Sequence, residues 1–346
     1  VRETTPALAA DLVLFLQAMG KQAGLFYVLK EANAFGAALL SSDENSFLKT
    51  LEAIEKGDLA ALVLVETDPF WFFPDRSRLK QALSKLEFLL VIDYLLSPTV
   101  SRSDIFLPSQ TLFEAGGIYV NQEGRAQWAP PVFKGGLPVE QVSAGGHPPH
   151  LFTKDIPGGE PRPAGHILMD LGRFLSPNKE FSFQALWTEL ARGNLAFSNF
   201  QDLKDQLEGI RIIPDQKDEK FSSFNGPVDT GEKGRRSNSV ELILVDKTFG
   251  TEELSAYSRP LREAGGRPYL TMATETGKRI GIQNKDHVVL SLDNGELELA
   301  VELTDHIAAG VMILPRHESL AWQKITAFPI WVSLDRITKA SKPEVA

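Results

Sequence analysis

Two aspartates follow apolar, strand-like runs and are the first residues of this chain that could bind a ligand. Asp68 and Pro69 lie in the loop after "ALVLVE", residues 61–66, and Asp93 ends "FLLVID", residues 88–93. Open α/β sheets bind their ligands at the carboxyl ends of parallel strands, where a carboxylate can accept hydrogen bonds. Asp before Pro also starts ordinary turns, and Asp93 could instead cap a helix. Both interpretations stay open.

A second candidate is the stretch "GGIYVNQEGRAQ", residues 116–127, which contains Asn121, Glu123 and Arg125. Locally this stretch predicts a β-hairpin, in which Gly124 takes a positive φ to close the turn. The same polar side chains could also contact a ligand. The sequence around the turn does not decide between these roles.

Other ionisable residues do not form a catalytic or metal-binding pattern. His147 and His150 in "HPPH" lack the further ligands that a zinc site needs, and there is no cysteine to supply them. Glu114 and Glu123 are nine residues apart with two glycines between them, so paired-carboxylate catalysis is not supported. We therefore expect no metal site and no catalytic residue in this chain.

The composition is that of a globular protein that acts neither on nucleic acid nor within a membrane. The 346 residues include 45 acidic and 36 basic side chains, and this acidic balance disfavours a nucleic-acid surface. No apolar run is long enough to span a bilayer. The absence of cysteine excludes disulfides, thiolate nucleophiles and the usual iron–sulfur ligands. Because the chain begins with Val1 and shows no signal sequence, we expect a fragment of a longer polypeptide.

The first half of the chain has the pattern of a parallel α/β domain. Helices are expected from about Thr5 to Gly20 and from Ser46 to Lys56, with a buried strand over "GLFYVL", residues 24–29. The strand-like runs 61–66 and 88–93 flank a helical stripe, which makes a βαβ unit. Their continuously apolar composition predicts a Rossmann-like parallel sheet with helices on both faces.

The second half divides at a polar segment. Residues 129–163 are rich in Pro and Gly and predict an irregular excursion without a long helix, after which helical patterns return. Residues 214–239 are polar and predict a linker. Beyond them, short strand patterns and a "DNG" turn predict a small β-barrel. The expected organisation is an α/β domain over 1–165, its helical continuation over 166–213, the linker over 214–239 and the barrel over 240–346.

Taken in order, these motifs resemble the molybdopterin oxidoreductase superfamily. That family has a strand with a small-polar-Pro loop, a strand ending in Asp, an "aDvvLP" strand, an acidic residue with glycine, and "N-x-E-G-R-x-Q". The matching residues are Asp68, Pro69, Asp93, Asp104, Leu107, Pro108, Glu114, Gly117, Asn121, Glu123, Gly124, Arg125 and Gln127. Also similar are "EANAFGA" around Asn33 and the segment 157–174, and residues 269–315 resemble the molybdopterin-dinucleotide-binding domain.

The resemblance implies a Rossmann-like α/β domain followed by a double-psi β-barrel. Within the superfamily the pattern is most similar to the G subunits of NADH-quinone oxidoreductase, respiratory complex I. It therefore implies part of an electron-transfer subunit, mainly a scaffold, whose iron–sulfur clusters lie on amino-terminal domains outside this chain. It also implies partner subunits of a redox complex, at the cytoplasmic face of the inner membrane and without direct membrane insertion.

The alternative is the carboxyl-terminal half of a molybdopterin-dinucleotide enzyme such as a formate dehydrogenase or nitrate reductase. In such an enzyme the candidate residues would contact molybdopterin guanine dinucleotide, whereas in a scaffold they would only support the fold. These residues are Asp68, Pro69, Asp93, Asn121, Glu123 and Arg125. Departures from the family pattern, such as "VIDY" and "SDIFLP", favour the scaffold, with no cofactor bound by this chain. A small-molecule binding protein that uses the sheet crevice is a third hypothesis.

Overall fold

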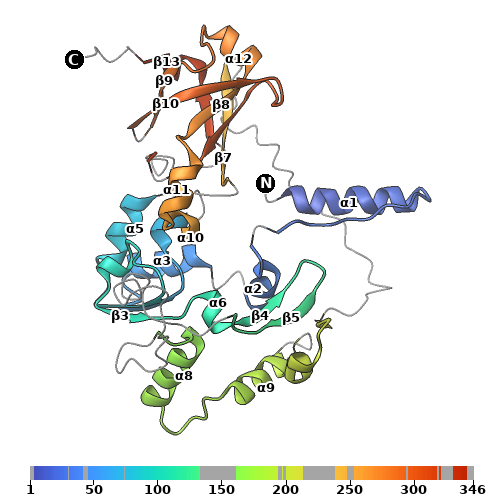
Figure 1. Ribbon diagram of the computed structural model, residues 1–346, viewed down its shortest axis with the longest axis vertical. Coiled ribbons are helices and arrows are strands. Elements are labelled where there is room, and N and C mark those ends of the chain that lie inside the picture. The colour runs from blue at the N-terminus through green and yellow to red at the C-terminus, as the bar shows by residue number, and fades with distance from the viewer. Residues whose placement is uncertain are drawn as a thin grey trace, which may run out of the picture. The chain divides into compact units, whose positions relative to one another are not determined.

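The computed structural model, whose helices and strands are drawn in Figure 1, divides into two compact units. The N-terminal unit comprises residues 5–67 and 85–225, and the C-terminal unit comprises residues 1–4, 68–84 and 226–346. The structure describes residues 4–29, 31–41, 46–73, 75–132, 161–193, 197, 200–212, 238–247, 253–293, 295–317, 319–320 and 330–340. Among the described helices, none combines the length and the apolar character needed to cross a membrane.

A three-stranded parallel sheet organises the N-terminal unit. Its strands are β1 (Ala61–Val65), β2 (Phe88–Asp93) and β3 (Ile105–Pro108), in that spatial order, and both neighbouring pairs are parallel. All residues of β2 after the first are buried. The continuously apolar run therefore forms a central parallel strand, as predicted.

Helix α8 (Ala164–Leu175) packs against one face of this sheet. Its residues Ile167 and Leu171 join Leu90 and Ile92 of β2 in one apolar cluster. The opposite face of β2 contributes to a second cluster with β1 and with Val100, so apolar side chains leave both faces of the central strand. Because both faces are covered, the polar groups of this sheet are concentrated where its strands end.

Helix α3 (Phe47–Lys56) confirms the helix predicted over residues 46–56. The Ser46 hydroxyl accepts a hydrogen bond from the Lys49 N–H at 3.3 Å, and Gly57 ends the helix with φ of 84°. A left-handed backbone at this position is available to glycine at little cost. Single residues therefore mark both ends of this helix in the structure.

A second, antiparallel sheet contains the predicted hairpin. It consists of β4 (Gly117–Val120), β5 (Arg125–Ala129) and β6 (Ile210–Arg211), in that order. Val120 and Ala126 of this sheet are buried in one hydrophobic cluster with Phe197, Leu203 and Ile212. The other elements of the N-terminal unit are α1 (Thr4–Ala18), α2 (Ala34–Leu40), η2 (Val100–Arg102), α6 (Leu112–Ala115), α9 (Phe183–Gly193) and η4 (Phe200–Asp205).

The buried strand predicted over residues 24–29 is not formed, and that prediction was wrong. The segment is extended but pairs with no strand among the described residues, and Val28 is 85% exposed. An apolar run becomes a strand only when a neighbouring strand supplies hydrogen-bond partners. Among the described residues, no neighbouring strand is present that would pair with this segment and bury it.

The C-terminal unit is built on a curled, mixed seven-stranded sheet in the order β12-β7-β11-β8-β10-β9-β13. The strands are β7 (Ser239–Val245), β8 (Tyr269–Ala273), β9 (His287–Leu292), β10 (Gly295–Thr304), β11 (Val311–Pro315), β12 (Ile330–Ser333) and β13 (Ile337–Lys339). Val332 and Ile337, on the two edge strands, join the same hydrophobic core. The sheet therefore curls around one core.

Short helices complete the C-terminal unit. They are α4 (Pro69–Phe72), α5 (Arg76–Leu83), α10 (Glu253–Ala256), α11 (Arg259–Gly265), α12 (Thr274–Arg279) and η6 (Leu334–Arg336). The antiparallel pair β9–β10 confirms the predicted hairpin. Most of the predicted excursion 129–163 and of the predicted linker 214–239 lies outside the described residues, although Ser239 already begins β7.

Candidate functional site

Asp68 and Pro69 form the start of helix α4. The Asp68 Oδ1 atom accepts a hydrogen bond from the Phe70 N–H at 3.0 Å, and Pro69 occupies the first helical position. Both residues are buried. Proline suits this position because its missing N–H would have no partner inside the helix. The acceptor oxygen of Asp68 therefore serves as a helix cap.

Asp93 lies at the carboxyl end of β2, as predicted. Its Oδ1 atom accepts hydrogen bonds from the Tyr94 N–H at 2.7 Å and the Leu95 N–H at 3.0 Å, and its side chain is buried. These bonds turn the chain as it leaves the sheet. Asp68 and Asp93 belong to different compact units, so a shared crevice for the two aspartates stays a prediction.

Glu66 and Ser109 join Asp93 at the ends of the three parallel strands. The Glu66 N–H donates to the Ile92 carbonyl at 2.7 Å, and the Ser109 N–H donates to the Asp93 carbonyl at 2.9 Å. Glu66 has φ of 49°, which is uncommon for a residue other than glycine. We call Glu66, Asp93 and Ser109 the strand-end group.

The surroundings of Glu66 raise the pKa of its carboxyl group. Desolvation by burial is the largest cause, and the negative charge of Asp93 adds to it, while the Ser109 hydroxyl favours the ionised form and opposes the shift. Sequence reasoning missed Glu66, although it ends the apolar run 61–66. The rule that selected Asp93, a carboxylate at the end of an apolar strand, could also have selected Glu66.

The hairpin between β4 and β5 is held by Asn121. Its Oδ1 atom accepts hydrogen bonds from the N–H groups of Glu123 and Arg125, both at 3.0 Å, and its own N–H donates to the Arg125 carbonyl at 3.0 Å. Gly124 has φ of 73°, as the turn requires. The predicted hairpin is thus present, and the side-chain oxygen of Asn121 closes it.

Arg125 and Glu123 line a cavity of about 450 Å³ together with Arg211, Gln122 and the apolar residues Leu25 and Phe26. Arg125 lies opposite Arg211 in the β5–β6 register, and the Arg125 Nη1 atom donates to the Glu208 carbonyl at 3.3 Å. Sequence reasoning missed Arg211, because nothing near it in the chain indicates that a two-residue strand would pair with the hairpin.

The strand-end group and the cavity beside β5 differ in the ligand that they could hold. At the strand ends, a phosphate would meet the carboxylates of Glu66 and Asp93 in a partly desolvated setting, so this group does not fit the phosphates of a pterin dinucleotide. In the cavity beside β5, guanidinium groups are suited to bidentate contacts with phosphate. The Glu123 carboxylate also lines this cavity, but two arginines, Arg125 and Arg211, outnumber it, so the cavity suits an anion better than the strand ends do.

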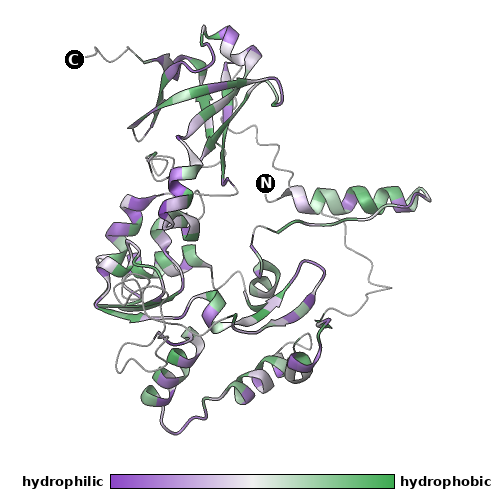
Figure 2. Ribbon diagram, in the orientation of Figure 1, coloured by the Kyte–Doolittle hydropathy of each residue, from purple (hydrophilic) through white to green (hydrophobic). Residues whose placement is uncertain are grey.

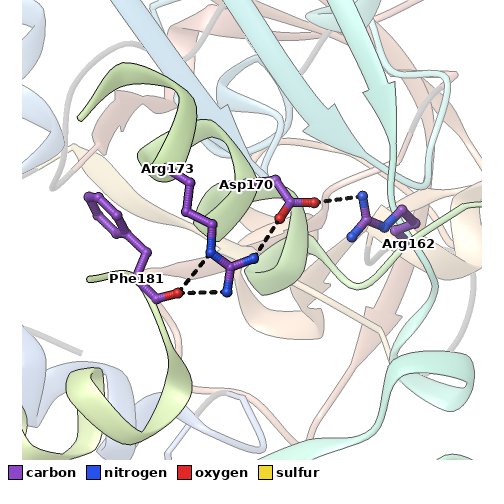
Figure 3. Close-up of polar contacts among 4 residues, drawn as sticks. All are labelled: Arg162, Asp170, Arg173 and Phe181. Carbon is purple, nitrogen blue, oxygen red and sulfur yellow. Dashed lines mark hydrogen bonds and ion pairs between the residues drawn. The ribbon is translucent and has the colours of Figure 1, made fainter. Parts of the chain in front are cut away.

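A third polar group fixes α8 near the end of the sheet (Figure 3). Asp170 pairs with Arg162 at 2.8 Å and with Arg173 at 3.0 Å, and the Arg173 Nε and Nη2 atoms donate to the Phe181 carbonyl at 3.0 and 2.7 Å. Arg162 forms a parallel bridge with Ser109 through its backbone. The pKa of the Asp170 carboxyl is lowered, mainly by its hydrogen bond with Arg162.

Metal binding finds no support among the described residues, where no group of three or more His, Asp or Glu side chains could hold an ion. His147 and His150 lie outside those residues.

Two family models match the chain, one in each half. The molybdopterin oxidoreductase model matches residues 3–135, and the molydopterin dinucleotide binding domain model matches residues 249–338. The first range holds the strand-end group and the hairpin, and the second holds most of the curled sheet. The two recognised regions therefore lie on either side of the predicted linker.

Relatives and one solved structure agree with these matches. The G subunit of NADH-quinone oxidoreductase from Shewanella oneidensis is 35% identical over 89% of this chain, and the F420-dependent formate dehydrogenase subunit alpha of Methanocaldococcus jannaschii is 23% identical over 79% of it. The chain spans 41% of the length of each. Acetylene hydratase from Pelobacter acetylenicus shares the fold, with a TM-score of 0.50, 14% identity and coverage of 78% of this chain and 39% of its own. The two halves of the chain therefore match the molybdopterin oxidoreductase and molydopterin dinucleotide binding domain families, and the chain resembles the G subunits of NADH-quinone oxidoreductase over most of its length.

Proposed function

We propose that this chain is the scaffold part of an electron-transfer oxidoreductase subunit and binds no cofactor of its own. The full-length protein resembles the G subunits of NADH-quinone oxidoreductase, and its iron–sulfur clusters lie on domains outside this chain. Partner subunits hold it at the cytoplasmic face of the inner membrane. Two facts support this role: the chain has no cysteine to bind a cluster, and it spans 41% of the Shewanella oneidensis relative.

One observation carries the scaffold role: one side-chain oxygen of each of three candidate residues accepts hydrogen bonds from neighbouring backbone N–H groups. Asp68 caps a helix, Asp93 turns the chain after a strand, and Asn121 closes a hairpin. Buried or partly buried backbone N–H groups need such partners whether or not a ligand binds. Asp68, Asp93 and Asn121 thus have a role in the fold that requires no ligand.

The curled sheet extends the same proposal to the C-terminal half, which we propose to be a double-psi β-barrel. The sheet mixes parallel and antiparallel pairs, and its two edge strands share one hydrophobic core. The proposed domain boundaries remain 1–165, 166–213, 214–239 and 240–346. Support for a division near the linker comes from the two family matches on either side of it.

The second candidate function is the carboxyl-terminal half of a molybdopterin-dinucleotide enzyme. It is favoured by the dinucleotide-binding match and by the formate dehydrogenase relative. In that case Arg125 and Arg211 would hold a phosphate of the dinucleotide in the cavity that they line. The bound group would supply the redox chemistry, and the residues of this chain would only orient it.

A thermal unfolding experiment with guanosine diphosphate separates the two functions, because this nucleotide carries the guanine and the two phosphates. A ligand at about one hundred times its Kd stabilises the folded state by about 2.7 kcal/mol. The scaffold role predicts no change in Tm with millimolar nucleotide. An increase in Tm that is lost in Arg125→Gln and kept in Arg192→Gln, an exposed arginine of α9, would contradict it.

A further inference from the structure

Helix α1 presents an apolar stripe that is about half-exposed among the described residues. Leu8, Leu12, Phe15 and Met19 recur at helical spacing, and their side chains are between 39% and 61% exposed. The only charged residue of the helix is Asp11. Figure 2 shows the hydrophobic colour along the helix. Exposed apolar surface of this continuity is typical of a docking site.

Another side of α1 already packs within this chain, so the stripe is not the surface that α1 uses for that contact. Residues 21–29 run back along the helix, as Figure 1 shows. The Gln17 Nε2 atom donates to the Ala23 carbonyl at 2.9 Å, and the Tyr27 hydroxyl donates to the Pro6 carbonyl at 2.6 Å. We call α1 together with residues 21–29 the arm. Its inner side is fixed by these contacts, while its outer side is open.

The extended half of the arm is also unpaired. Its sequence is rich in the residues that favour strands, including Phe26, Tyr27 and Val28, yet it pairs with no strand among the described residues. Phe26 is 60% exposed and Val28 is 85% exposed. A strand-forming segment covered on one side by a helix is the unit from which parallel α/β sheets are built. The arm therefore has the form of an α/β unit that lacks its sheet.

From this geometry we infer that the arm docks onto an open sheet edge in a further part of the same polypeptide. Residues 24–29 add a strand to that edge, and the α1 stripe packs against an apolar surface beside it. The arm lies inside residues 3–135, which match one domain model, so it belongs to a folded α/β domain. The Shewanella oneidensis relative aligns with 89% of this chain but is much longer, since only 41% of it is covered. A mainly apolar face, with Asp11 as the one charge beside it on the helix, suits a permanent contact of this kind.

The cysteine-free sequence allows a direct test with single-cysteine variants. Phe15→Cys reports on the stripe, and Leu207→Cys, at a position that is 99% exposed, is the matched control. Each variant is made in the 346-residue chain and in the complete gene product, and maleimide labelling is followed by mass spectrometry of the cysteine-containing peptide. We expect labelling of Phe15→Cys to slow about tenfold or more in the complete product, and labelling of the control to stay within about twofold.

Hydrogen exchange supplies the second readout. Amides of residues 24–29 should exchange rapidly in the 346-residue chain and become protected in the complete product, because they then donate to a neighbouring strand. Several results would overturn the inference. The first two are a gene product no longer than this chain and unchanged labelling of Phe15→Cys in the complete product. Protection that needs another subunit would also overturn it, as would protection that rises with the concentration of the isolated chain, which would indicate a second copy. Protection of the stripe without protection of residues 24–29 would overturn the strand pairing.

Discussion

Around the candidate site, single side-chain oxygens accept the hydrogen bonds of backbone N–H groups at turns. Asn121 accepts two backbone hydrogen bonds within its own turn, and Asp93 accepts two just after its strand. Such contacts stop the chain from offering unpaired N–H groups where it changes direction. They also explain why these residues fit a family pattern without any need for a ligand.

Asn121→Ala is predicted to destabilise the N-terminal unit by about 1–2 kcal/mol, because two backbone N–H groups lose their acceptor. Asn121→Asp keeps the Oδ1 acceptor and should recover most of this free energy. Urea denaturation measures both variants. Equal stability of the alanine variant and the unchanged chain would show that Asn121 does not support the hairpin.

Glu66→Gln tests the strand-end group through pH. The folded state raises the pKa of Glu66 above its ordinary value of 4.5, so protonated Glu66 contributes stability below that value. This contribution is lost as the pH rises through the raised pKa. Since glutamine does not ionise, the variant should gain stability relative to the unchanged chain between about pH 4 and about pH 7. Urea denaturation at both pH values is the measurement, and a pH-independent difference would contradict the assignment.

At the residue scale, the sequence predicted the hairpin turn but not the residues of other strands that pair with it. Gly124 and Asn121 were readable because a hairpin turn needs positive φ and a local acceptor. Arg211 was not readable, because its pairing with Arg125 joins residues far apart in the chain. Such contacts depend on how sheets assemble rather than on local pattern.

Among the elements, α8 shows how a helix is fixed by charge as well as by packing. Asp170 binds one arginine that precedes the helix and one within it, and Arg173 reaches the Phe181 carbonyl before α9 (Figure 3). The apolar side of α8 packs against β2 through Ile167. Both contacts hold the helix beside the strand ends.

Asp170→Asn is predicted to lower the stability of the N-terminal unit at neutral pH, because both ion pairs lose their anion. The folded state lowers the pKa of Asp170 below its ordinary value of 3.8, so the stabilisation is present above 3.8 and is lost as the pH falls through the lowered pKa. The difference between variant and unchanged chain should therefore shrink as the pH is lowered below 3.8. Urea denaturation across this range tests it. Glu189→Gln, which removes a weak exposed pair on α9, should have no measurable effect.

Element types were largely predictable, and the exceptions have a physical cause. Continuous apolar runs became β1 and β2, and a capping serine and a stop glycine bounded α3. The run at residues 24–29 had the same character but formed no strand, because the described residues offer no edge for it. The apolar pattern of a segment specifies that it can form a strand, and the presence of a neighbouring strand decides whether the strand forms.

At the scale of the whole molecule, two recognised regions flank the predicted linker, and each surrounds its own hydrophobic core. The order of motifs along the chain identified the superfamily, which no single motif could do. The seven-stranded order of the C-terminal sheet was beyond prediction, since strands distant in sequence pair within it. The proposed scaffold role rests on the hydrogen bonds that Asp68, Asp93 and Asn121 make to the backbone.

The most direct test of that role is the metal and pterin content of the full-length protein, purified from its own cells. Molybdenum and tungsten are measured by mass spectrometry, and pterin is measured by fluorescence after oxidative release. The scaffold role predicts neither metal in stoichiometric amount and no released pterin. Stoichiometric molybdenum or tungsten together with released pterin would contradict it and establish the molybdopterin enzyme instead.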